Sequence, residues 1–250
     1  MRQLLIHRHH LVRMRARIKN QLQHMALKQG WQKKSRLGSR AGLELLRHLK
    51  LEPWAGQRRD TLLAMLEDLE EKIKPLDQAV AREAERNQMA RLLATHPGVG
   101  PVTSLATVLT MGDVNRFADS RNWVSYVGLN PSEEPSGQRR RLGAISKQGN
   151  PFLKQLLVEA ALTAARGDKD LGRMNARLKA RKHHGVAKVA VARKLAVRLY
   201  WMARTKRSYP DVVRMQGSQS HAVAEVKAET LNRPLPPISS EQGGRLHEQS

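Results

Sequence analysis

The stretch that decides the fold is residues 95–166, which begins THPGVGPVTSLATVLTM and ends GNPFLKQLLVEAALTAAR. Near its start, Gly98 and Gly100 flank a single apolar residue between two apolar runs with helical spacing. Glycine tolerates the backbone angles of a tight turn, and a turn of this kind leaves N–H groups pointing outward. We therefore expect a helix-hairpin-helix-like turn that can contact phosphate, although similar turns also cap helices of many other kinds.

The middle of this stretch, residues 130–147, contains Pro, Ser, Gly and Arg without a helical period, which predicts a loop or a loose hairpin. It carries Ser136, then Gly137, then the run Arg139–Arg141. A serine hydroxyl becomes a nucleophile only when it is activated or its leaving group is stabilised, and guanidinium groups do the latter in phosphoryl chemistry. The residues alone equally fit a turn serine in a solvated basic loop, because Ser and Gly both favour turns.

The end of the stretch predicts a helix that starts at Asn150-Pro151 and closes at Gly167. Asparagine is a good N-cap and proline suits the first helical turn, where its missing N–H would be unpaired anyway. The expected buried stripe is Phe152, Leu153, Leu156, Leu157, Ala160 and Ala164.

The order of these motifs, GLNP, then SG, then RRLG, then GNPFL, resembles the C-terminal transposase domain of insertion-sequence family 110. The basic N-terminal helix and the late run ARKLAVRLYWMAR share the resemblance. Members of that family are bridge-RNA-guided recombinases, so the resemblance implies recombination of DNA at sites chosen by a guide RNA. It also implies that Ser136 is the nucleophile, forming a transient phosphoserine link, and that the neighbouring arginines stabilise the phosphate charge.

One departure from the family pattern concerns the missing RuvC-like domain. Complete members begin with that domain and its Asp-Glu-Asp-Asp tetrad, and nothing in this sequence resembles it. The resemblance therefore implies a truncated copy, or one whose start was assigned late, that is inactive by itself. Mg²⁺ is expected only with the missing domain, and no cofactor is expected in this chain. The alternative is a catalytically dead remnant that still binds nucleic acid.

Charge is the strongest compositional signal. The 250 residues contain 45 Lys and Arg against 22 Asp and Glu, a formal net charge of +23, which favours a polyanionic partner. Cysteine is absent, which excludes disulfides and thiolate metal sites. The histidines lack carboxylate neighbours and the acids do not converge, so no metal site is predicted. No apolar run is long enough to span a bilayer and no signal peptide is evident, so we expect a cytoplasmic protein without membrane contact.

The N-terminal segment predicts a helix from Met1 to about Lys28, with one apolar stripe and basic residues on its other faces. Almost no acid is interleaved with these cations, which favours contact with nucleic acid over a merely solvated face. The candidate DNA- and RNA-binding residues of this segment are Arg13, Arg15, Arg17 and Lys19.

The apolar residues Leu62, Leu66, Leu69, Ile73, Leu76 and Val80 alternate four and three positions apart, which is coiled-coil spacing. We expect a homo-oligomer through this stripe. An antiparallel helical hairpin within one chain is the alternative, because the first helix is cationic and this one carries an acidic patch. Pro75 lies inside the pattern and should kink the helix or mark a break, since it removes one backbone donor.

The remaining signals predict further helices. A short helix is expected at 43–51, others around 102–111 and 120–127, and two basic helices at 168–181 and 186–205, separated by a break at Gly185. Phe117, Trp123, Tyr126 and Val127 favour a core cluster over base-stacking platforms. The remaining nucleic-acid candidates are Gly98, Gly100, Arg139, Arg140, Arg141, Lys147, Arg193 and Lys194, with Lys188 and Arg198 also open to phosphate.

The sequence as a whole therefore predicts an all-α protein. Its expected parts are a basic helix and coiled-coil segment at 1–87, a compact helical domain with the serine-bearing loop at 88–205, and a disordered tail at 206–250. The tail contains Pro, Ser, Gly and Gln without an apolar period, and such composition buries too little apolar surface to fold.

Overall fold

The computed structural model describes residues 1–31, 39–136, 139–145 and 148–214, and for residues 40, 132–136 and 139–144 it describes the backbone alone. The chain divides into two compact units, Met1–Tyr209 and Pro210–Ser250. All elements described below belong to the first unit. The predicted disordered tail begins too early at 206, because residues 209–214 are helical and the Tyr209 hydroxyl donates to the Asp168 carboxylate at 2.9 Å. Its larger part, from residue 215 onward, lies outside the described residues, as does Lys147.

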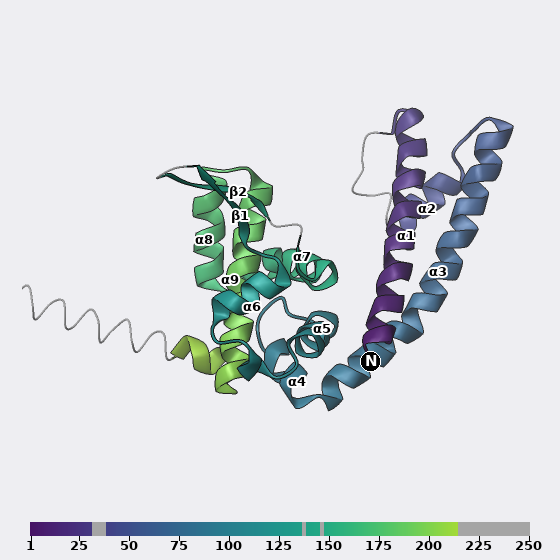
Figure 1. The fold of residues 1–250 in the computed structure, drawn as a ribbon. Helices are drawn as coiled ribbons and strands as arrows, with labels where there is room; N and C mark the ends of the chain where they lie inside the picture. Colours follow the sequence, from purple (N-terminus) through teal and green to yellow (C-terminus); the bar gives the residue numbers. More distant parts are fainter. Residues whose placement is uncertain (32–38, 137–138, 146–147, 215–250) are drawn as a thin grey trace, which may run out of the picture. The chain divides into compact units, whose positions relative to one another are not determined.

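Two long helices, α1 (Arg2–Lys28) and α3 (Pro53–Arg86), pack along each other as a helical hairpin (Figure 1). The cationic α1 and the acidic part of α3 also form two ion pairs, Arg8 with Asp77 and Lys19 with Glu70. The apolar cluster here contains Ile18, Leu22, Met25, Ala26, Leu46, Leu62, Leu63, Leu66 and Leu69. Apolar burial and opposite charge therefore select the same pairing within one chain.

This packing corrects the predicted homo-oligomer through the stripe on α3. Leu69 and Ile73 are only 5% and 2% exposed in the single chain, so they are not available to a second copy. The intrachain alternative is the one observed. Replacing either residue with Asp is expected to destabilise the chain itself, because an unpaired charge would enter its core. Association through another surface stays a prediction.

Two helix details bear on the expectations. α3 continues through Pro75, so the predicted break is not observed, while a kink there stays a prediction; the buried stripe continues on both sides, at Ile73 and Val80. The burial on either side outweighs the one backbone donor that proline removes. The short helix α2 spans Arg40–Arg47 rather than 43–51 because Ser39 caps it, accepting a 3.2 Å hydrogen bond from the Gly42 N–H.

The rest of the unit packs around α9, which spans His184–Thr205 (Figure 1). Its neighbours are α4 (Gln88–Ala94), η2 (Val114–Arg116), α6 (Ser120–Val127), α7 (Pro151–Gly167) and α8 (Lys169–Lys179), and α5 (Pro101–Met111) packs on α4 and α7. Two side-chain bonds join η2 and α6 to α9. The Trp123 indole N–H donates to the Ala196 carbonyl at 3.2 Å, and the Tyr200 hydroxyl donates to the Phe117 carbonyl at 3.1 Å. The predicted aromatic core is therefore confirmed, except that Tyr126 remains 47% exposed.

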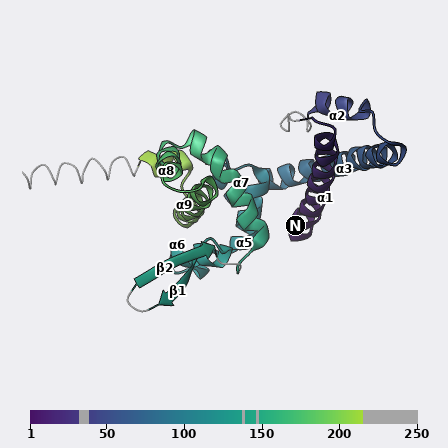
Figure 2. The same ribbon diagram turned by 90° about the horizontal axis from the view of Figure 1, so that it is seen from above.

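A β-hairpin lies between α6 and α7 (Figure 2). Its strands are β1 (Pro131–Ser136) and β2 (Arg139–Ile145), paired antiparallel with an irregularity between Pro131 and Glu133. The hairpin alternative for residues 130–147 is thus the observed one. The all-α class is confirmed, with this single two-stranded sheet added among the described residues.

One predicted break is wrong. Gly185 lies inside the first turn of α9, which begins at His184, and does not separate the two basic helices. The separation falls earlier, after Lys179. The His183 ring caps α9 by accepting a 3.2 Å hydrogen bond from the Gly185 N–H. Such a cap satisfies an otherwise unpaired donor at the helix start.

Candidate nucleic-acid interface

The foot of the hairpin is held by two glycines in contact. Gly128 and Gly149 have φ angles of +82° and +91°, in the left-handed region that glycine tolerates. A Cβ on Gly149 would lie 2.5 Å from the Gly128 nitrogen, and one on Gly128 would lie 2.0 Å from the Gln148 carbonyl oxygen. The chain leaving α6 therefore crosses the chain entering α7 at a separation that no side chain permits.

Local capping fixes both sides of this crossing. At the end of α6, the Leu129 N–H donates to the Val124 carbonyl at 3.1 Å, which closes the helix in a Schellman-type arrangement around Gly128. At the start of α7, the Asn150 side chain accepts a 3.0 Å bond from the Leu153 N–H, as its N-cap role predicts. The two ends of the hairpin are consequently held in fixed positions by the capped ends of α6 and α7.

Ser136 is the last residue of β1, and its Cα partner across the hairpin is Arg139. Arg140 and Arg141 follow along β2 opposite Pro135 and Glu134. The fold therefore brings the backbone of the serine beside that of the basic run, as a short hairpin turn requires. The side chains of these residues lie outside the described part of the chain.

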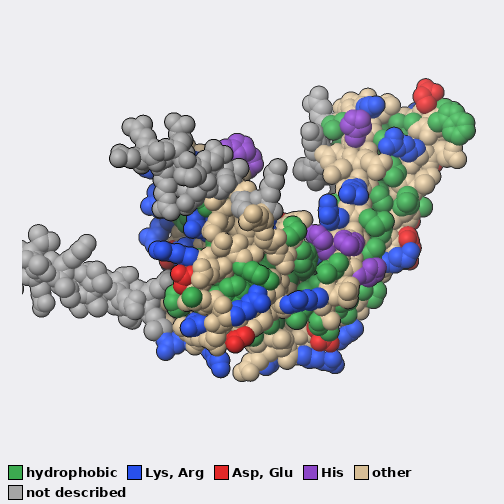
Figure 3. Space-filling view, viewed as in Figure 1, with side chains coloured by type: hydrophobic (Ala, Val, Ile, Leu, Met, Phe, Trp, Pro, Cys, Tyr) green, Lys and Arg blue, Asp and Glu red, His purple; other side chains and the backbone are tan. Residues whose placement is uncertain are grey.

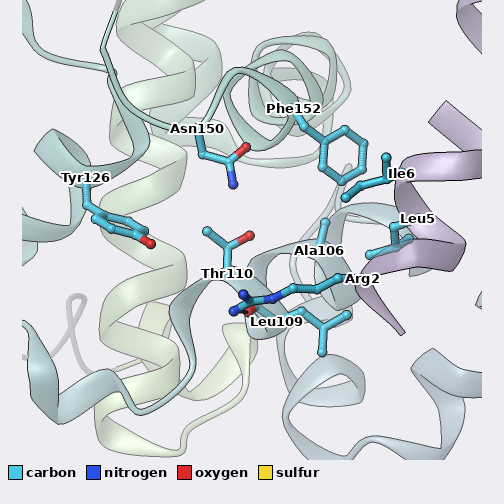
Figure 4. Close-up of a pocket in the computed structure, with 9 residues that line it drawn as sticks. All are labelled: Arg2, Leu5, Ile6, Ala106, Leu109, Thr110, Tyr126, Asn150 and Phe152. Carbon is cyan, nitrogen blue, oxygen red and sulfur yellow. Dashed lines mark hydrogen bonds between the residues drawn. The ribbon is translucent and has the colours of Figure 1, made fainter. Parts of the chain in front are cut away.

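Two cavities adjoin the foot of the hairpin. One, of about 450 Å³, is lined by Ser125, Tyr126 and residues 148–150. The other, of about 120 Å³, lies near the start of α1 and is shown in Figure 4. Tyr126 and Asn150 line both, and Asp or Glu lines neither. The smaller cavity adds the guanidinium of Arg2, which donates to the Leu109 carbonyl at 2.6 Å. Apolar side chains make up most of the lining of the smaller cavity, and neither cavity presents a carboxylate that would repel an anionic group.

Helices α8 and α9 carry a cationic surface. Residues 171–209 contain twelve Lys and Arg and no Asp or Glu. Figure 3 shows Lys and Arg side chains gathered on the outer side of α8. Arg193 and Lys194, both predicted contacts, are exposed. Asp168 and Asp170, just before this segment, pair with Arg198 and Arg173. The cations of the segment still outnumber these two acids, and such an excess of one sign attracts polyanions.

The basic residues of α1 divide into two groups. Arg13 and Arg17 are exposed and Arg15 is half-buried, and none of the three forms an ion pair with another described residue. Lys19, in contrast, pairs with Glu70 at 3.1 Å, so part of its charge serves the packing of α1 on α3. The predicted nucleic-acid contacts on α1 therefore reduce mainly to Arg13, Arg15 and Arg17.

The glycine turn has a structural explanation. Gly98 has a φ of +83°, and a Cβ there would lie 2.4 Å from the Ala164 nitrogen on α7. Gly98 is thus needed for close packing of the turn on α7. Gly100 is exposed and forms the N-cap of α5, where its own conformation is extended. Of the two predicted phosphate contacts, the position of Gly100 suits that role better, since helix starts present free N–H groups.

A buried ionic cluster lies where α7, α8 and α9 meet, and the sequence did not predict it. Asp168, 2% exposed, pairs with Arg198, 5% exposed, and accepts a 2.9 Å bond from the Tyr209 hydroxyl. The same carboxylate caps α8 through the Leu171 N–H at 2.9 Å. Arg198 also reaches Asp170 at 3.2 Å. The prediction that Arg198 is open to phosphate is therefore wrong, because its guanidinium is enclosed by two acids.

A sequence signal for this cluster does exist. Asp168 and Asp170 are the last acids before the acid-free segment, and Arg198 lies among the apolar residues of the α9 stripe. A cation on a buried face needs an acidic partner, and these two are the nearest along the chain. Only their meeting in space shows which arginine is paired.

His96 lies against this cluster and is enclosed. Its Nε2 is 3.7 Å from the Asp168 carboxylate, its Nδ1 lies 2.8 Å from the Pro97 carbonyl, and its ring packs on Tyr209 with centroids 4.5 Å apart. Burial lowers the pKa of His96 from 6.5 to about 4, and the Arg198 charge acts in the same direction. The imidazole is therefore neutral at neutral pH.

The buried His96 predicts a loss of stability in acid. Its folded pKa of about 4 is below its unfolded value of 6.5, so the unfolded chain binds the proton more readily between these values. The stabilising contribution is complete above pH 6.5 and is lost as the pH falls to about 4, with a total of about 3 kcal/mol. Urea unfolding of the wild type and His96→Gln across this window measures the difference. An identical pH slope in both would contradict the assignment.

No group of three or more His, Asp or Glu side chains among the described residues is placed to hold a metal ion. None of the described helices combines the length and the apolar character needed to cross a membrane.

Known proteins resemble the part of the chain that contains the hairpin and α7. Residues 90–177, from α4 into α8, match the sequence model of the family described as "Transposase IS116/IS110/IS902 family". A probable family 20 transposase of Pseudomonas aeruginosa is 37% identical over 123 residues, which are 49% of this chain and 32% of that protein.

Two other relatives are transposases of insertion sequence elements. The transposase for IS1111A of Coxiella burnetii is 33% identical over 103 residues, 41% of this chain and 26% of the relative. The transposase for IS1328 of Yersinia enterocolitica is 28% identical over 208 residues, 78% of this chain and 60% of the relative. In each case the chain spans less than two thirds of the relative's length.

Proposed function

We propose that this chain, which belongs to the IS116/IS110/IS902 transposase family, serves DNA transposition by binding DNA and a guide RNA and by presenting Ser136 as the nucleophile. The observation that supports nucleic-acid binding most directly is the cationic surface of α8 and α9, in which residues 171–209 contain no Asp or Glu. A second acid-free segment, residues 1–43, supplies the exposed arginines of α1 and supports a separate contact, which we assign to the guide RNA.

The proposed covalent step takes place on the hairpin. The Ser136 Oγ attacks a DNA phosphorus, the Oγ–P bond forms, and the bond from phosphorus to the leaving DNA oxygen breaks. The serine loses its proton and the leaving oxygen gains one, so atoms and charge balance. Attack by another DNA hydroxyl then reverses the step and restores the serine. Arg139 and Arg140 would stabilise the charge on the non-bridging oxygens.

The foot of the hairpin supports this proposal because a nucleophile must be held in place to be effective. The crossing of Gly128 and Gly149 fixes where the hairpin leaves the helical core, and the two carboxylate-free cavities lie beside that point. Mg²⁺, which the family resemblance associates with a RuvC-like domain, has no matching cluster among the described residues of this chain. No step proposed here passes through it.

Nucleic-acid binding by the α8–α9 surface is expected to depend steeply on salt. Replacing Arg193 and Lys194 with Glu should weaken DNA binding and reduce the slope of log affinity against log salt by about 1.8, because each phosphate contact on duplex DNA contributes about 0.9. Fluorescence anisotropy with labelled duplex DNA at several salt concentrations measures both quantities.

A matched control exists on α3. Arg82 and Arg86 are exposed but lie beside Glu83 and Glu85, so changing both arginines to Glu alters net charge equally on a surface of mixed sign. This variant should bind almost as the wild type does. If the two double variants lose affinity equally, net charge alone governs binding and the proposed surface is wrong.

A further inference from the structure

We infer that Trp201 is a stacking platform for an unpaired nucleobase, a role that rests on the nucleic-acid binding proposed above and specifies its ligand. Trp201 is 47% exposed on α9, although tryptophan is among the most buried residue types on average. Its indole meets the Tyr200 ring edge-on, with centroids 5.3 Å apart at 79°. Tyr200, in contrast, is 1% exposed, so the protein anchors one ring and leaves the next one outside.

The charges around Trp201 indicate what it meets. Lys194 lies seven residues before it and Arg204 three residues after it, so all three fall on one side of α9. Both cations are exposed, and neither forms an ion pair with another described residue. From Lys194 to Arg204 the helix rises about 15 Å, enough to follow several phosphates of one strand.

An aromatic face between two free cations fits a single strand better than a duplex. The cations contact the backbone phosphates, and the indole stacks on a base whose face is open. In a duplex the bases are already stacked on each other, so the indole has no face to meet. The ligand is therefore an unpaired base in DNA or RNA, such as a loop, a bulge or a melted strand.

Trp54 provides the matched control for this inference. It is 82% exposed, more than Trp201, but it lies at the start of α3 beside the exposed Glu52. Of the two cations that follow it, Arg58 hydrogen-bonds Gln21 at 3.0 Å and Arg59 pairs with Asp60 at 2.8 Å. Exposure alone would give Trp54 the larger role. The unpaired cations Lys194 and Arg204 are the reason why we assign base stacking to Trp201.

The test uses the full chain and four labelled probes of one sequence: single-stranded DNA, single-stranded RNA and the two corresponding duplexes. Trp201→Leu, which keeps apolar bulk without an aromatic face, should weaken single-strand binding by about 5- to 150-fold. Trp201→Phe should recover part of that loss. Duplex binding and the Trp54→Leu variant should change less than about twofold. The DNA and RNA arms show which strand is the preferred source of the base.

A second measurement follows stacking directly. The difference in emission between the wild type and Trp201→Phe isolates the Trp201 indole, and this difference should decrease when the single strand is added. Unchanged single-strand affinity in Trp201→Leu, or an equal loss on duplexes, would overturn the inference while nucleic-acid binding itself stands. A Trp201→Leu variant that sediments as a smaller species would instead make this side of α9 a contact between copies. Failure of the wild type to bind any probe would contradict the proposed function itself.

Discussion

Asp168→Ala is expected to lower the free energy of unfolding by about 3–5 kcal/mol, because it leaves the buried Arg198 guanidinium without its main partner. Asp168 is 2% exposed and Arg198 is 5% exposed, so water cannot replace the lost carboxylate. The change also removes the acceptor for the Tyr209 hydroxyl and the cap of α8. Urea denaturation followed by circular dichroism measures the loss.

Asp170→Ala is the matched control for Asp168→Ala. Its carboxylate also reaches Arg198, at 3.2 Å, but its side chain is 54% exposed. Because water screens the exposed Asp170 carboxylate, this ion pair should contribute only about 0–1 kcal/mol. Replacing both buried charges together, with Asp168→Asn and Arg198→Met, should recover much of the stability lost in Asp168→Ala, since no unpaired charge remains. A loss below about 1 kcal/mol in Asp168→Ala would contradict the proposed importance of the cluster.

Ser136→Ala is expected to abolish DNA joining while leaving DNA binding within about twofold of the wild type. The change removes the only atom of this residue that can form the covalent link and keeps charge and chain length unchanged. Losing a nucleophile can cost about 10³-fold or far more in rate. The assay supplies a RuvC-like domain, by fusion or co-expression, and uses a denaturing gel to trap protein joined to DNA.

Ser132 provides a matched control, since it is a second serine on the same strand, β1. Ser132→Ala should leave the covalent adduct intact. Gly149→Val keeps the hydroxyl of Ser136 but places a side chain against the Gly128 backbone, so it should reduce joining by displacing the hairpin. An adduct that persists in Ser136→Ala would remove Ser136 from the mechanism. If joining persists in all three variants while DNA binding is intact, this chain acts only as a binding module.

The sequence predicted the helices well because their signals are local. The stripe in α7, its N-cap at Asn150 and its end at Gly167 depend on neighbours within four residues along the chain. The structure confirms the cap, the end and four residues of the stripe, while Phe152 and Leu156 are only partly buried and Ala161 is buried in addition. The errors in helix boundaries are also local in origin. Gly185 looks like a break by composition, but the His183 ring caps the helix start just ahead of it.

The candidate site was predictable only in part. Its residue types and order, a serine beside a basic run and an acid-free segment at residues 171–209, are properties of the chain itself. The anchoring of the hairpin is not predictable in this way, because Gly128 and Gly149 are 21 positions apart and are required only where the two backbone segments cross. Either glycine alone resembles an ordinary turn residue.

Composition and periodicity by themselves determined the all-α class, the cationic character and the positions of the long helices, since these follow from side-chain spacing and net charge. Tertiary structure alone decided which partners those side chains have. It buried the stripe at Leu69 within one chain, withdrew Arg198 from solvent and turned Gly98 toward α7. The physical reason is that burial and ion pairing depend on distances between segments remote in sequence, which no local pattern encodes.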